Sequence, residues 1–309
     1  MQLRSRHLLG LEDATAEEIT LILDTAETFR EIIERPIKKV PTLRGITVLN
    51  LFYEPSTRTR ISFELAEKRL SADTVSFTPG TSSVKKGESL RDTVQNIEAM
   101  KIDMVVVRHS SSGVPYFLTQ CTQSNIINAG DGAHEHPTQA LLDMFTIRRK
   151  YKKLKDLRVV LVGDIKHSRV VRSNIWGLKT MGASVAVCGP STLLPFEVEK
   201  FGVDIFTDLD KAIDGADVVN IMRIQLERQQ AGLFPSQREY TNLFGMTRER
   251  LQLLNKNYTI MHPGPINRGV EITNEVADGD SSVILEQVTN GQAVRMAVLF
   301  LLSGKKEEE

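Results

Sequence analysis

The chain of 309 residues has little cysteine, no excess of either sign of charge and no long apolar run. Its two cysteines, Cys121 and Cys188, form neither a disulfide framework nor the spacing of a zinc site. Basic and acidic residues number 39 each, so the net charge indicates no nucleic-acid or membrane partner. No segment has the length of a membrane-spanning helix, and the first residues lead into no secretory apolar region. The composition therefore favours a cytoplasmic protein with reduced thiols.

The length suits two domains, each with its own core. Short apolar runs of strand-forming residues alternate with amphipathic helical patterns in both halves, which is typical of the α/β class. We expect each domain to be a mostly parallel sheet flanked by helices. The charged run at residues 151–156 predicts the boundary, with the first domain over residues 1–150 and the second over 151–289. A C-terminal helix at about residues 290–304 is expected to pack back on the first domain.

The most informative segment lies between a predicted strand at residues 46–52 and a predicted helix at 61–70. It reads Glu-Pro-Ser-Thr-Arg-Thr-Arg over positions 54–60. A helix N-terminus favours an anion, and arginine is normally disfavoured there unless something negative offsets it. The hydroxyl and guanidinium groups at this end of the helix therefore predict a phosphate site, formed by Ser56, Thr57, Arg58, Thr59 and Arg60. The alternative is an ordinary capped helix with two surface arginines.

Further polar groups follow predicted strands in the first half. Arg108 ends a strand at residues 103–109, and His136 follows one at 125–128. His136 suits donation of a hydrogen bond to a substrate carbonyl, with Gln139 one turn later on the same face. His134 and His136 are also candidate metal ligands. No third ligand stands at a familiar spacing, however, so no metal is predicted. The remaining alternative for His136 is a histidine that only caps the helix.

The second half begins with a strand–helix–strand outline over residues 158–188. This outline is typical of dinucleotide-binding folds. The Gly-x-Gly-x-x-Gly turn that admits a pyrophosphate is missing, so no cofactor is predicted. Lys166 and Arg169 in its first loop suit a small anionic substrate instead. Later strands are followed by Arg223 with Gln225, and by His262-Pro-Gly-Pro265, in which Gly264–Pro265 is a candidate cis peptide.

All of these groups follow the carboxyl end of a predicted strand, which is the edge where open α/β sheets bind ligands. The groups in the first half suit phosphate and carbonyl oxygens, and those in the second half suit a dicarboxylate. If the two sheet edges face each other, the active site lies in the cleft between the domains.

The motifs also resemble the transcarbamoylase family over nearly the whole chain. The resemblance rests on residues 52–64, 85–88, 128–132, 136–139, 163–166, 223–228 and 262–265. The last of these replaces the His-Cys-Leu-Pro signature of ornithine-specific members, and Arg223 with Gln225 suits an acidic amino acid better than a cationic one. The resemblance is therefore to the aspartate-specific branch, although Gly264 stands where many relatives carry a leucine.

The resemblance implies transfer of a carbamoyl group from carbamoyl phosphate to L-aspartate, with no cofactor and no metal. Carbamoyl phosphate would be held by Ser56, Thr57, Arg58, Thr59, Arg108, His136 and Gln139, joined by Ser82 and Lys86 from an adjacent chain. The catalytic residues among them would be Thr59, Arg108 and His136, which polarise the carbonyl, and Lys86. Aspartate would contact Lys166, Arg169, Arg223, Gln225, Gly264 and Pro265.

The resemblance also implies a homotrimer with active sites shared between chains, since Ser82 and Lys86 match residues that reach a neighbour's site. Taken alone, the lysines at 85 and 86 would be solvated surface. Regulatory chains and other enzymes of pyrimidine biosynthesis stay open as further partners. Two alternatives for the function also stay open: carbamoyl transfer to another amino acid such as ornithine, and a non-catalytic phosphate-binding paralogue.

Overall fold

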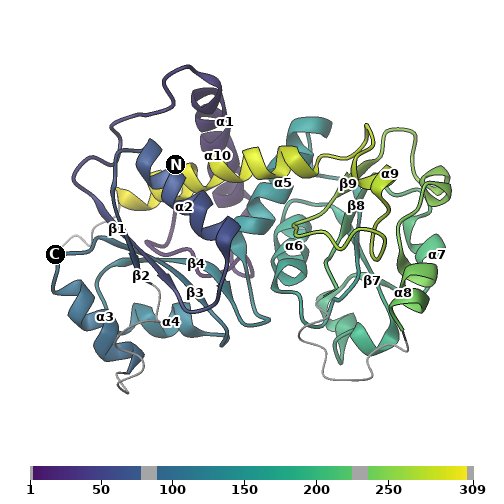
Figure 1. The fold of residues 1–309 in the computed structure, drawn as a ribbon, viewed down its shortest axis with the longest axis horizontal. Coiled ribbons are helices and arrows are strands. Elements are labelled where there is room, and N and C mark those ends of the chain that lie inside the picture. The colour runs from purple at the N-terminus through teal and green to yellow at the C-terminus, as the bar shows by residue number, and fades with distance from the viewer. Residues whose placement is uncertain (1–2, 78–88, 225–235, 305–309) are drawn as a thin grey trace. The chain divides into compact units, whose positions relative to one another are not determined.

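The computed structural model describes residues 3–77, 89–224 and 236–304 (Figure 1). The chain divides into two compact units, one formed by Met1–Phe145 with Thr289–Glu309 and the other by Thr146–Val288. The division therefore falls within two helices, α5 (Pro137–Tyr151) and α10 (Ile284–Ser303). Each unit is built on a parallel sheet flanked by helices, which confirms the predicted α/β class.

The first unit has a parallel sheet with the strand order β2-β1-β3-β4. Its strands are β1 (Thr47–Phe52), β2 (Asp73–Phe77), β3 (Met104–His109) and β4 (Asn125–Asp131). Its further helices are α1 (Ala16–Glu34), α2 (Thr57–Arg69), α3 (Leu90–Glu98) and α4 (Val114–Thr119). Because the chain runs from β1 to β2 on one side and then to β3 on the other, the strand order reverses between β1 and β3. Ligands of such sheets bind outside the carboxyl ends of the strands at this reversal.

Side chains of β1 alternate between the two faces of this sheet. Leu49 lies in an apolar cluster with Val94 of α3 and Leu118 of α4. The next residue, Asn50, is fully buried, and its Nδ2 donates to both carboxylate oxygens of Glu67 on α2, at 3.0 and 2.8 Å. Helices α3 and α4 thus cover one face and α2 covers the other, as Figure 1 shows. This packing fixes the first turn of α2 beside the carboxyl end of β1.

The second unit has a parallel sheet with the strand order β7-β6-β5-β8-β9. Its strands are β5 (Arg158–Val162), β6 (Ser184–Cys188), β7 (Asp204–Phe206), β8 (Val218–Ile221) and β9 (Thr259–Met261). Its helices are α6 (Arg169–Thr180), α7 (Leu209–Ile213), α8 (Gln237–Phe244) and α9 (Asn274–Ala277), with 3₁₀ segments at Ser191–Leu193, Val198–Phe201 and Glu249–Leu253. Here the strand order reverses between β5 and β8, which marks the second ligand-binding edge.

The long elements follow the sequence prediction closely. Strand β5 begins and β6 ends at the bounds of the predicted outline over residues 158–188, and β4 runs on past residue 128 to Asp131. Helix α1 begins with a capping box, in which the side chains of Thr15 and Glu18 bond to each other's backbone. The C-terminal helix, expected at about residue 290, begins earlier, at Ile284. None of the helices within the described ranges is long and apolar enough to cross a membrane.

Candidate active site

Three of the predicted groups lie along one edge of the first sheet. Strands β1, β3 and β4 are consecutive neighbours. Ser56–Arg60 follows β1, Arg108 is the second-last residue of β3, and His136 follows β4. Since parallel strands end at the same edge, the topology brings the predicted phosphate and carbonyl groups together there.

The first turn of α2 is open to an anion. Ser56 is the N-cap residue with an extended backbone, and its side chain makes no capping hydrogen bond. Thr57 and Arg58 are exposed, whereas Thr59 is buried. The turn contains no acidic residue. The partial positive charge of this helix end is therefore not offset from within its own first turn, which favours a bound anion.

Arg108 is fixed by the ends of two neighbouring strands. Its Nη2 donates to Glu54 Oε1 at 3.0 Å, just beyond β1, and its Nη1 donates to the carbonyl of Ala129 in β4 at 3.2 Å. The side chains of Arg108 and Glu54 are only 12% and 14% exposed. A guanidinium held at two points can present its remaining edge to a ligand without a large loss of conformational freedom.

His136 stands at the start of α5 and is buried. Its carbonyl accepts the backbone N–H groups of Gln139 at 3.0 Å and Ala140 at 3.3 Å, so it occupies the N-cap position. Gln139 lies one turn further on, and its Nε2 donates to Asp143 Oδ1 at 3.0 Å. This bond orients the amide so that Gln139 Oε1 is the acceptor on the other side.

Arg295 on α10 supports the start of α2. Its Nη1 donates to Ser62 Oγ at 2.9 Å, and its guanidinium lies 5.3 Å from the centre of the Phe63 ring. Burial lowers the pKa of Arg295 to about 10, and the charge of Asp143 opposes that fall. The side chain thus remains protonated at neutral pH, and it interacts with both α2 and α5.

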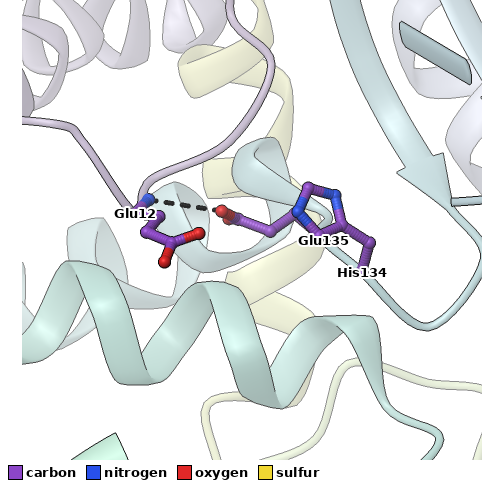
Figure 2. A group of neighbouring side chains, drawn as sticks. All are labelled: Glu12, His134 and Glu135. Carbon is purple, nitrogen blue, oxygen red and sulfur yellow. Dashed lines mark hydrogen bonds between the residues drawn. The ribbon is translucent and has the colours of Figure 1, made fainter. Parts of the chain in front are cut away.

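A second side-chain cluster adjoins His136 and is drawn in Figure 2. Glu12, His134 and Glu135 offer ligand atoms within 4.8 Å of one another. Yet the two oxygens of Glu135 accept the backbone N–H groups of Leu11 at 2.8 Å and Glu12 at 3.2 Å. These bonds explain the position of Glu135 as an anchor for the turn before α1, without a cation.

His134 in this cluster has a partner of its own. Its Nδ1 lies 3.1 Å from Asp131 Oδ2. Burial alone would raise the pKa of Asp131, but hydrogen bonds from His134, Asn128 and Gly113 hold it below its usual value. Asp131 is therefore an ionised acceptor that fixes the ring of His134.

The second sheet has a corresponding edge. Strands β5, β8 and β9 are consecutive neighbours. They are followed by Lys166 and Arg169, by Arg223, and by the residue 262–265 loop. Lys166 is exposed, whereas Arg169 is buried at the first position of α6, after the N-cap residue Ser168. A guanidinium at this positive helix end favours an anionic ligand.

The residue 262–265 loop contains a cis Gly264–Pro265 bond, a state that the sequence left open. Gly264 has a φ of +66°. A side chain is strained in this left-handed region, which favours glycine at this position.

Ser82, Lys86 and Gln225 lie outside the described residues. The cleft expected between the domains stays a prediction. The sequence reasoning missed Glu54, Asp143 and Arg295, which hold the ligand-binding candidates in place. Their partners are distant in the chain or carry no motif, so no local pattern could have identified them.

Comparison with known proteins gives matches over both halves. Residues 6–149 match the family described as "Aspartate/ornithine carbamoyltransferase, carbamoyl-P binding domain", and residues 155–302 match its "Asp/Orn binding domain". The chain is 61% identical over 303 residues to the aspartate carbamoyltransferase catalytic subunit of Gemmatimonas aurantiaca, covering 98% of this chain and 95% of that one.

Solved structures of the family are also similar along the whole chain. The catalytic subunit of M. Jannaschii aspartate transcarbamoylase is 36% identical with a TM-score of 0.84, over 99% of this chain and 100% of that chain. Ornithine carbamoyltransferase from Pyrococcus furiosus is 30% identical with a TM-score of 0.87, over 99% and 100%. The fold is thus shared by aspartate-specific and ornithine-specific enzymes. On these matches the chain belongs to the aspartate/ornithine carbamoyltransferase family.

Proposed function

We propose that the chain transfers the carbamoyl group of carbamoyl phosphate to the amine of L-aspartate, giving N-carbamoyl-L-aspartate and phosphate. The observation that carries this proposal is the 61% identity, over 98% of this chain, to a relative named aspartate carbamoyltransferase catalytic subunit. Arg169 and Arg223 along the second sheet edge agree with it. They would attract the two carboxylates of aspartate and repel the cationic side chain of ornithine.

The first unit would bind carbamoyl phosphate. The phosphate would lie at the first turn of α2, where it meets backbone N–H groups together with the side chains of Ser56, Thr57, Arg58 and Thr59. Arg108, held by Glu54 and Ala129, would contact the phosphate and the carbonyl oxygen. Gln139 Oε1 would accept a hydrogen bond from the carbamoyl amide, since its Nε2 is already bonded to Asp143.

Catalysis would come from placement and charge stabilisation. The neutral aspartate amine attacks the carbonyl carbon, and negative charge develops on the carbonyl oxygen. Phosphate then leaves as the C–O bond breaks and takes up the proton that the new C–N nitrogen loses. Thr59, Arg108 and His136 would donate hydrogen bonds to that oxygen, an arrangement in which one donor contributes about 10²–10³ in rate. No covalent intermediate is needed, because the substrate already contains an activated acyl group.

The second unit would bind aspartate. Arg169 and Arg223 would hold its two carboxylates, with Lys166 nearby and with Gln225 following Arg223 in the chain. The backbone of Gly264 and Pro265 would contact the amino group.

The active unit would be a cytoplasmic homotrimer in pyrimidine biosynthesis. Ser82 and Lys86 would complete a neighbour's site, and regulatory chains or other pathway enzymes would be further partners. Tyr116 and Phe117 of α4 are 64% and 44% exposed, an apolar surface that an interface between copies would cover.

Reassembled mixtures of Lys86→Ala and His136→Ala chains test whether active sites are shared between chains. Activity of the mixture above that of either parent supports shared sites. Hybrids no more active than the parents contradict shared sites.

The function is tested by mixing the purified chain with carbamoyl phosphate and L-aspartate. Phosphate should be released only when both are present, with one N-carbamoyl-L-aspartate formed per phosphate. A non-catalytic paralogue would bind carbamoyl phosphate but release no phosphate in response to aspartate.

A further inference from the structure

A continuous chain of hydrogen bonds connects the two backbone segments at the second sheet edge. The backbone N–H of Gly264 donates to Nδ1 of His262 at 2.7 Å. Nε2 of His262 lies 3.3 Å from Glu271 Oε1, which also accepts the backbone N–H of Asn267 at 2.5 Å. Nδ2 of Asn267 then donates to the carbonyl of Ile224 at 3.0 Å. The chain thus runs from Gly264 to the residue that follows Arg223.

The protonation of His262 follows from its partners. Because Nδ1 accepts a backbone N–H, it carries no proton, so the ring is neutral with its proton on Nε2. That proton is donated to Glu271, and both side chains are fully buried. His262 is anchored from a third side, since its backbone N–H donates to Gln287 Oε1 at 3.0 Å. The ring and the carboxylate are therefore held in fixed positions by buried hydrogen bonds.

Asn267 is the member of the chain that joins the two segments. Its backbone belongs to the loop after Gly264–Pro265, and its side chain reaches the segment after β8. Ile224, its acceptor, is fully buried next to Arg223. A shift of this contact would move the backbone that carries Arg223 relative to Gly264. Asn267 itself is only half-buried, so its substitution leaves the apolar core of the unit intact.

We propose that Asn267, held by Glu271 and His262, is a positioning residue that sets the spacing between Arg223 and the Gly264–Pro265 backbone. This inference rests on the proposed function, because the spacing matters for a ligand that contacts both segments. Aspartate is such a ligand, because the Arg223 guanidinium would hold one of its carboxylates while the Gly264–Pro265 backbone contacts its amine. A small misplacement of such groups has a large effect on binding and rate.

The test compares Asn267→Ala with Asn255→Ala as a matched control. Asn255 lies in the same unit and its Nδ2 also makes one hydrogen bond, to Asp217 Oδ1 at 2.7 Å. Steady-state kinetics with L-aspartate, calorimetric binding of carbamoyl phosphate and thermal melting are measured for both variants and for the unaltered chain. Glu271→Gln, which keeps the shape of the carboxylate, is measured as a second variant of the chain of hydrogen bonds.

Loss of this partly buried hydrogen bond predicts a rise of about fivefold to tenfold in the aspartate KM of Asn267→Ala. Its Kd for carbamoyl phosphate should stay within about twofold, and Asn255→Ala should keep the aspartate KM unchanged. Glu271→Gln should raise the same KM in the same direction. If Asn267→Ala lowers the melting temperature but leaves the aspartate KM unchanged, or weakens the binding of both substrates equally, the inference is overturned. Asn267 then has a purely structural role. Failure of the unaltered chain to carbamoylate aspartate would instead overturn the proposed function, and the inference with it.

Discussion

Glu54 holds Arg108 through a hydrogen bond of 3.0 Å, although 54 residues separate the two in the chain. The contact connects the segment after β1 to the end of β3, on the two sides of the point where the strand order reverses. The guanidinium that is proposed to contact the reacting carbonyl is thereby oriented before any substrate binds.

Substitution Glu54→Gln should lower kcat by about tenfold while changing the carbamoyl phosphate Kd by less than about threefold. The amide keeps the shape of the side chain but weakens the charge-assisted bond that orients Arg108. Binding changes less, because the positive charge that attracts phosphate remains and is less neutralised. Stopped-flow or steady-state kinetics with calorimetry would measure both quantities. An unchanged kcat would show that the Glu54 contact has no part in catalysis.

Replacement of His136 by alanine should reduce kcat by about 10²–10³, with little change in carbamoyl phosphate binding, because charge reaches the carbonyl oxygen only during attack. His134→Ala provides a neighbouring control, since the ring of His134 is directed to Asp131. That control should keep kcat within about threefold. Near-normal turnover of His136→Ala would remove this residue from the catalytic set.

Arg223→Lys should raise the aspartate KM severely, by about tenfold or more, while leaving the Kd for carbamoyl phosphate unchanged. A guanidinium binds a carboxylate through two parallel hydrogen bonds, which an ammonium group cannot do. Arg158→Lys is the control, because Arg158 begins β5 at the opposite end of the same sheet. If Arg223→Lys weakens both substrates equally, Arg223 does not belong to the aspartate half of the site.

The buried carboxyl group of Glu67 should make the stability of the folded chain depend on pH. Burial raises its pKa from 4.5 to about 7, although the hydrogen bonds from Asn50 oppose the rise. In the unfolded chain the group ionises near its ordinary pKa, whereas the folded chain keeps the proton, so this contribution to stability is full below about 4.5 and decreases as pH rises to about 7. The variant Glu67→Gln keeps a neutral side chain at every pH.

Melting temperatures of the unaltered chain and of Glu67→Gln should therefore diverge between pH 4.5 and 7, with the variant gaining relative stability as the pH rises. Glu64→Gln, on the same helix and partly exposed, is the control. Parallel melting curves of Glu67→Gln and the unaltered chain across this range would show that Glu67 ionises with an ordinary pKa.

The elements that carry the site could be predicted because each has a strong local pattern. The apolar runs of β1, β3, β5 and β8 and the N-terminal signals of α2 are contiguous in the sequence. Since parallel strands end at one edge, these local patterns also predict that Arg108 and His136 lie on neighbouring strands with the α2 turn. The family motifs then add the chemistry that each position carries.

The supporting contacts could not be predicted, because they join residues that are far apart or lack any motif. The bond from Asn267 to Ile224 spans 43 positions, and the bond from Arg295 to Ser62 spans 233. Strand β7 has only the three residues Asp204–Phe206, too few for a periodic signal, and its position beside β6 comes from tertiary pairing. The early start of α10 also depends on its surroundings rather than on an N-cap signal in the sequence.

The most direct test of the account is a competition between the two amino acids that the family uses. The purified chain is incubated with carbamoyl phosphate and equal concentrations of L-aspartate and L-ornithine, and the products are identified by mass spectrometry. We expect N-carbamoyl-L-aspartate in about hundredfold excess or more, because the cationic side chain of ornithine would meet Arg169 and Arg223. Carbamoylated ornithine as the main product would contradict it.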